Sequence, residues 1–112
     1  MPLFHRFLRL QRFEEAAESV EIALTHASGD LLLESVLIEQ RGSARRALNR
    51  EAEAFADFER CRALRLELLA SGDTRVVPLL ERSLHLLREA KRTEEAAVVE
   101  QALAKHPRQT PD

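Results

Sequence analysis

The stretch NREAEAFADFERCRAL, residues Asn49–Leu64, decides the fold of this chain. Within it, Ala54, Phe58 and Cys61 follow one another at spacings of four and three residues. Such spacings place small and aromatic side chains on one side of a helix. The stretch therefore predicts a helix that packs closely against a neighbouring helix.

Two other segments begin in the same way as this helix. Its opening pentad, REAEA at Arg50–Ala54, is echoed by RFEEA at Arg12–Ala16 and by RTEEA at Arg92–Ala96. All three pentads have Arg first, Glu fourth and Ala fifth, and successive arginines are 38 and 42 residues apart. A period of this length is typical of helical-repeat arrays, in which each helix pair buries its apolar side against the next.

The composition predicts an all-α protein. Of 112 residues, 45% are hydrophobic, which leaves room for one domain with a modest core. Four Pro and three Gly are too few for many strands and tight turns. The abundant residues are Ala, Leu, Glu and Arg, all of which are good helix formers.

Charge and cysteine content exclude several classes of protein. A formal net charge of −2 provides no overall positive field for nucleic acid or anionic lipid, and no apolar run approaches the roughly 18 residues of a membrane span. Arg6 and Arg9 interrupt the apolar N-terminal segment, which therefore lacks a signal-peptide core. Cys61 is alone, so an intramolecular disulfide is impossible. We expect a cytoplasmic protein that contacts neither nucleic acid nor membrane.

The first half of the chain is expected to form three helices. A short helix opens at Pro2, breaks near Gln11 and Arg12, and is followed by a helix over 13–26. Ser28-Gly29-Asp30 ends that helix and caps the next, over 31–48. The buried side of the second helix is expected to consist of Phe13, Ala16, Val20, Ala23 and Leu24.

Gly42 lies inside the third expected helix, where Gly costs about 1 kcal/mol relative to Ala. Close approach of a neighbouring helix would compensate for this cost, and a loop at Gly42 is the alternative. The second half is expected to form helices over 50–70, from Pro78 in a first turn to Ala90, and over 93–105. The total is six helices in three antiparallel pairs.

The second helix of each pair resembles the B helix of tetratricopeptide repeats (TPRs). The matching segments are FEEAAESVEIAL, EAEAFADFERCRAL and TEEAAVVEQAL, and Gly42 falls where that family often has Gly in its A helix. The resemblance implies a short right-handed superhelix: a single TPR-like domain over 1–107, with repeats over roughly 1–28, 30–70 and 74–107 and a flexible tail over 108–112. The repeats exceed the usual length of about 34 residues, as in variants from bacterial regulators. An irregular helical bundle is the rival architecture.

No constellation of residues predicts catalysis, a metal or a cofactor. The four histidines are widely separated, and we expect none of them to form the i, i+4 pair with an acid that a helical metal site shows. Cys61 occupies a small, packed helix position, which predicts a buried thiol. The paired glutamates at 14–15 and 94–95 begin helices, where negative charge complements the helix dipole. We expect a protein that is not an enzyme.

The run RGSARRALNR holds the only dense basic cluster, formed by Arg41, Arg45, Arg46 and Arg50. No aromatic residue lies near it for base stacking. A solvated helix face, a site for an acidic peptide and, least favoured, an RNA site are the three interpretations.

The resemblance also implies a binding site for a partner protein. In the family, the A helices line a concave groove that holds extended peptides. Arg46 and Arg88 occupy matching positions in successive repeats, so two guanidinium groups could meet one acidic ligand. The groove candidates, by position, are His5, Glu39, Ser43, Arg46, Glu81, His85 and Arg88.

The apolar N-terminal segment suggests an alternative function. A lone end helix covers only one side of an array, so part of its apolar stripe should remain exposed. This predicts either self-association, as in a homo-dimer, or excision from a longer array. The self-association candidates are Leu3, Phe4, Phe7 and Leu8.

Overall fold

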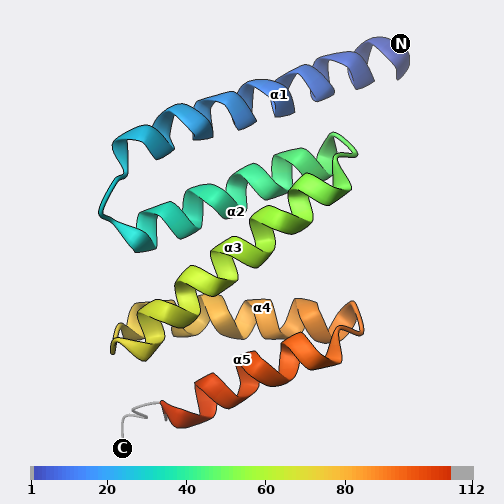
Figure 1. Ribbon diagram of the computed structural model, residues 1–112. Helices are drawn as coiled ribbons and strands as arrows, with labels where there is room; N and C mark the ends of the chain where they lie inside the picture. Colours follow the sequence, from blue (N-terminus) through green and yellow to red (C-terminus); the bar gives the residue numbers. More distant parts are fainter. Residues whose placement is uncertain (1, 107–112) are drawn as a thin grey trace, which may run out of the picture. The chain divides into compact units, whose positions relative to one another are not determined.

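The computed structural model describes the backbone of residues 2–106 and the side chains of Arg6 and of residues 8–106. Within this part of the chain all regular structure is helical, as the composition predicts (Figure 1). The chain divides into two compact units, Met1–Cys61 and Arg62–Asp112, so the boundary falls inside the third α-helix. The helices are α1 (Pro2–His26), α2 (Leu31–Ala47), α3 (Glu51–Ala70), the 3-10 helix η1 (Thr74–Val76), α4 (Val77–Glu89) and α5 (Thr93–Lys105).

Helix α1 corrects the sequence analysis. The predicted break near Gln11 and Arg12 is absent, and one helix of 25 residues replaces the two that were expected. The reason is local, because no Gly or Pro lies between Pro2 and His26, and Gln and Arg both favour helix. The described chain thus has five α-helices instead of six, and a single leading helix takes the place of the first predicted pair.

The buried face of α1 is close to the predicted one. Val20 is buried and Phe13, Ala23 and Leu24 are half-buried, but Ala16 is exposed and Ala17 is buried in its place. Positions 13, 17, 20 and 24 form one continuous stripe at spacings of four, three and four residues. Along this stripe α1 packs against α2, which runs antiparallel to it in the first unit (Figure 1).

Three of the four helix connections close with the same hydrogen bond. The backbone N–H groups of Arg50, Asp73 and Arg92 each donate to the carbonyl oxygen five residues earlier, at 2.8, 2.9 and 2.9 Å. This is the Schellman arrangement, which needs a residue of positive φ before the donor. Gly72 supplies it at one connection with a φ of 93°, whereas Asn49 and Lys91 adopt φ values of 63° and 60° at the other two.

The predicted Asp cap of α2 is present. The Asp30 side chain accepts a hydrogen bond from the Leu33 backbone N–H at 3.0 Å, which satisfies one of the free donors of the first turn. Gly29 precedes it with a φ of 92°, a conformation that suits Gly. These two residues turn the chain back so that α2 lies along α1.

Gly42 is helical and buried, so the alternative of a loop at this position is wrong. A Cβ atom added to Gly42 would lie 3.0 Å from Cε1 of Phe58 and 3.1 Å from Cβ of Asp57, both on α3. The prediction of close approach by a neighbouring helix is confirmed. Ala54 and Cys61, on the same side of α3, are also buried, which confirms the buried thiol.

The second unit is built from the end of α3, η1, α4 and α5. Its fully buried apolar side chains include Leu69, Val76, Leu80 and Val99, which come from all four of these elements, and Arg65 of α3 is fully buried as well. Pro78 lies in the first turn of α4, where its missing N–H costs nothing, as predicted. Helices α4 and α5 pack against each other in antiparallel directions (Figure 1).

The contact at Gly42 predicts a specific mutational result. Gly42→Ala gains roughly 1 kcal/mol of helix propensity but forces an overpacked contact that costs about 1–3 kcal/mol. Urea denaturation should show a net loss of roughly 1 kcal/mol in the free energy of unfolding. The control is Ser43→Ala, at an exposed site in the same helix, which should change stability by less than about 0.5 kcal/mol. Stabilisation by Gly42→Ala would contradict the close contact.

Candidate functional site

Helices α2 and α4 carry the predicted groove residues at identical spacings. The α2 stripe comprises Glu39, Ser43 and Arg46, and the α4 stripe comprises Glu81, His85 and Arg88. Each stripe begins with Glu, continues with a neutral polar or imidazole side chain (Ser or His), and ends with Arg. The spacings are four and three residues, so the three members share one helix face. The seventh candidate, His5, lies outside the described side chains.

Each stripe is partly open to solvent. In both, the acidic residue, Glu39 or Glu81, is half-buried, and the other two residues are exposed. The α2 stripe belongs to the first unit and the α4 stripe to the second, and each is considered by itself. The structure therefore presents two short polar surfaces, each ending in an exposed guanidinium group.

The two arginines differ in their partners. Arg88 Nη2 donates to Glu100 Oε2 on α5 at 2.7 Å, and both side chains are more than half exposed. A surface ion pair of this kind contributes about 0–1 kcal/mol, so a ligand carboxylate can replace Glu100 at small cost. Arg46 has no ion-pair partner among the described side chains. On the α4 stripe, His85 Nε2 lies 3.1 Å from Glu89 Oε1, so the expectation that no histidine pairs with an acid four residues away is wrong for His85.

The basic run has a structural role that the sequence analysis missed. Arg41 donates through Nη2 to Asp57 Oδ1 at 2.8 Å and through Nε to Oδ2 at 3.1 Å. Arg45 Nη1 donates to the same Oδ2 at 2.9 Å. We call these three residues the Asp57 cluster. Arg41 and Arg45 thus bind an acid of the chain itself, which none of the three interpretations of the basic run included.

The Asp57 cluster is shielded from solvent and compensated in charge. The Asp57 side chain is 5% exposed, whereas those of Arg41 and Arg45 retain about a fifth of their surface in solvent. The hydrogen bonds to Asp57 raise the pKa of Arg41 above its ordinary value, although burial opposes the shift. Glu53 lies 3.3 Å from Arg45 Nε, so a second carboxylate balances the second guanidinium.

Only one member of the basic run has no ion-pair partner among the described side chains. Arg50 Nη2 pairs with Glu14 Oε1 of α1 at 3.0 Å. Arg41 and Arg45 are held by Asp57, which leaves Arg46. The signal for Asp57 was in the sequence: it lies three residues after Ala54 and four before Cys61, on the buried side of α3.

Neither a metal-ligand group nor a membrane-spanning helix is found among the described residues. No group of three or more His, Cys, Asp or Glu side chains among them is placed to hold a metal ion. Between Pro2 and His106, no helix combines the length and apolar character that crossing a membrane requires.

The self-association candidates are described only in part. Leu8 is 37% exposed on α1. The side chains of Leu3, Phe4 and Phe7 lie outside the described residues. Ile22, also on α1, is 64% exposed, so α1 has apolar surface that its own unit leaves uncovered.

Comparison with known proteins gives no relative. The chain matches no protein-family model, no curated protein and no solved structure.

The Asp57 cluster predicts a large effect for a nearly isosteric change. Asp57→Asn leaves two partly buried guanidiniums facing a neutral group, and loss of one partner from such a cluster costs roughly 3 kcal/mol. Urea denaturation should show this loss. The matched control is Glu14→Gln, which removes the exposed pair with Arg50 and should cost less than about 1 kcal/mol. Equal losses of unfolding free energy in the two variants would contradict a special stabilising role for the Asp57 cluster.

Proposed function

We propose that this protein is a non-enzymatic, TPR-like scaffold that binds a segment of another protein along α2 and α4. The observation that carries the proposal is the repetition of one stripe. Glu39, Ser43 and Arg46 on α2 correspond in spacing and exposure to Glu81, His85 and Arg88 on α4. A surface repeated on successive first helices suits an extended ligand that meets the same chemistry twice.

Two features of the packing support a TPR-like arrangement of the hairpins. Gly42 of α2 meets the Phe58 ring of α3, the contact that a Gly in the first helix of such a repeat would serve. Ala54 and Cys61, four residues before and three after Phe58 on α3, have small buried side chains. The proposed architecture is a short right-handed superhelix in which α1 precedes two helix hairpins.

The charges favour an acidic partner segment. Arg46 is free of ion pairs among the described residues, and Arg88 is engaged only by exposed Glu100. Guanidinium groups bind carboxylates in a two-pronged geometry, which favours Asp or Glu side chains in the ligand. Arg41, Arg45 and Arg50 are paired within the chain, which reduces the positive charge that a nucleic acid would need.

The proposal also covers the cellular compartment and the source of the protein. The lone cysteine is buried on α3, in keeping with a reducing compartment, so we place the protein in the cytoplasm. The repeat length suggests a bacterial source by its similarity to bacterial variants of the family. The scaffold needs no cofactor, because binding is its only activity.

A second candidate function is formation of a homo-dimer through the apolar N-terminal end. The exposure of Leu8 and Ile22 favours it, since exposed large apolar side chains on one helix are suited to a partner surface. In this alternative, α1 is the functional surface. The stripes on α2 and α4 are then ordinary solvated faces.

Charge reversal tests the proposed site. A fluorescent Glu- and Ser-rich peptide without large apolar side chains should bind the wild-type chain in low salt. The double variant Arg46→Glu/Arg88→Glu should weaken its binding at least tenfold, because the chain loses two carboxylate partners and gains two repulsive charges. Fluorescence anisotropy measures the change.

The matched control is Arg60→Glu/Arg82→Glu, which alters net charge equally at two other exposed arginines. The affinity of this control variant for the peptide should stay within about threefold of wild type, a margin that covers the effect of its altered net charge. Equal weakening by both double variants would contradict a specific site on the stripes. A dimer that binds no peptide would favour the alternative function.

A further inference from the structure

The two stripes differ in how far acids of the chain already occupy them. Arg88 Nη2 on α4 donates to Glu100 Oε2 on α5 at 2.7 Å. Arg46 on α2 has no ion-pair partner among the described side chains. A ligand carboxylate therefore meets a neutralised guanidinium on α4, and on α2 a guanidinium whose charge no described acid offsets.

One difference between the two repeats accounts for this contrast. Arg46 and Arg88 are 42 residues apart. The same offset takes Phe58 of α3 to Glu100 of α5, so the first unit has an aromatic ring where the second has a carboxylate. The Phe58 ring is half-buried beside Gly42 and carries no charge. The acid that holds Arg88 thus has no counterpart for Arg46.

The hairpin of α4 and α5 brings Glu100 to Arg88. The two helices are antiparallel (Figure 1), and side chains on a helix lean toward its N-terminus, so these two lean toward each other. One hydrogen bond joins them, whereas Arg41 donates two to Asp57. Both side chains are more than half exposed, at 57% and 61%. The pair is therefore weak enough to exchange with a carboxylate from outside.

Glu100 opposes the binding of a ligand at Arg88 in two ways. It occupies a donor of the guanidinium, and its negative charge repels a second carboxylate at the same place. A two-pronged bond to a ligand, which uses two donors at once, is therefore strongest after Glu100 has moved away. The affinity of the α4 stripe then falls in proportion to the fraction of molecules in which Arg88 is unpaired.

We propose that Glu100 is an internal competitor for ligand carboxylates at Arg88, and thereby lowers the affinity of the α4 stripe below that of the α2 stripe. The inference rests on the proposed function, because it concerns the same partner segment. It gives the scaffold an order of binding, in which an acidic segment engages Arg46 first and gains Arg88 only by displacing Glu100. A segment with a single acidic residue is bound mainly on α2.

Replacing Glu100 by its neutral isostere tests the competition. The Glu- and Ser-rich peptide should bind Glu100→Gln about threefold more tightly than wild type, because a surface pair of this strength no longer competes. The gain should shrink as added salt screens both the pair and the peptide. Fluorescence anisotropy measures the affinities, and circular dichroism verifies that each variant is folded.

A double-substitution cycle separates competition at Arg88 from a general effect of charge. On an Arg88→Gln background, Glu100→Gln should change the affinity by less than about 1.5-fold, because the contested guanidinium is gone. Glu94→Gln, which removes an exposed acid from the same helix, should leave the affinity within about 1.5-fold of wild type. The cycle also predicts that Arg88→Gln costs more affinity in the Glu100→Gln chain than in wild type.

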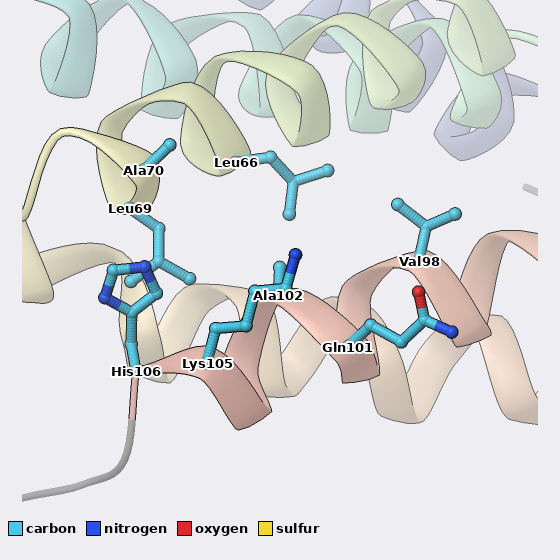
Figure 2. Close-up of a pocket in the computed structure, with 8 residues that line it drawn as sticks. All are labelled: Leu66, Leu69, Ala70, Val98, Gln101, Ala102, Lys105 and His106. Atoms are coloured by element: carbon cyan, nitrogen blue, oxygen red, sulfur yellow. The ribbon is translucent and has the colours of Figure 1, made fainter.

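A cation elsewhere on α5 provides a second control. Between the end of α3 and α5 lies a hollow of about 280 Å³, and Lys105 lines it together with Leu66 and Val98 (Figure 2). Glu100 lies on another face of α5 and is not part of this lining. Lys105→Gln should therefore weaken the binding of the peptide by less than about 1.5-fold. Arg88→Gln in the Glu100→Gln chain should weaken it at least threefold.

Two results would overturn the inference and leave the proposed function standing. One is a Glu100→Gln chain that binds the peptide no more tightly than Glu94→Gln does. The other is an equal gain from Glu100→Gln with and without Arg88. In either case Arg46→Glu/Arg88→Glu still weakens the binding of the peptide if the stripes are the site. A peptide that binds neither wild type nor Glu100→Gln would contradict the proposed function and the inference together.

Discussion

The close approach of α2 and α3 at Gly42 is the constraint on which the first unit depends. Asp57 contributes to this contact in two ways. Its Cβ lies 3.1 Å from the position that a Cβ on Gly42 would occupy, and its carboxylate accepts hydrogen bonds from Arg41 and Arg45. The two arginines precede and follow Gly42 by one and three residues, so they reach Asp57 from both sides of the glycine. Steric fit determines how close the helices come, and the ion pairs fix their register.

This arrangement decides which charges are left for function. Arginines that bind Asp57 cannot bind a partner without leaving a buried carboxylate unpaired, which is costly. The basic run thus separates into a structural pair, Arg41 and Arg45, and two exposed side chains, Arg46 and Arg50, of which Arg46 has no ion-pair partner among the described side chains. The same separation holds in the second unit, where Arg62 and Arg92 are engaged by Glu95, while Arg88 and Lys105 stay at the surface. Binding chemistry is expected where cations are not needed for packing.

The sequence predicted the features that depend on local pattern. Helix class, the Asp30 cap, the position of Pro78 and the close contact at Gly42 all follow from spacing and backbone chemistry. The continuity of α1 was missed because the repeat pattern suggested a break where no residue enforces one. Asp57 was missed because a carboxylate is assumed to face solvent, and only tertiary structure brings two arginines to it. The hollow beside Val98 depends on two helices distant in sequence, so spacing alone could not reveal it.

Proton NMR tests the central contact most directly. With no Cβ on Gly42, its α protons should lie against the Phe58 ring, whose Cε1 is 3.0 Å from the ideal Cβ position. The account predicts nuclear Overhauser cross-peaks between the Gly42 α protons and the Phe58 ring protons, together with an upfield shift of the α resonances. Absence of these cross-peaks, in a protein whose residues 31–47 and 51–61 remain helical, would contradict it.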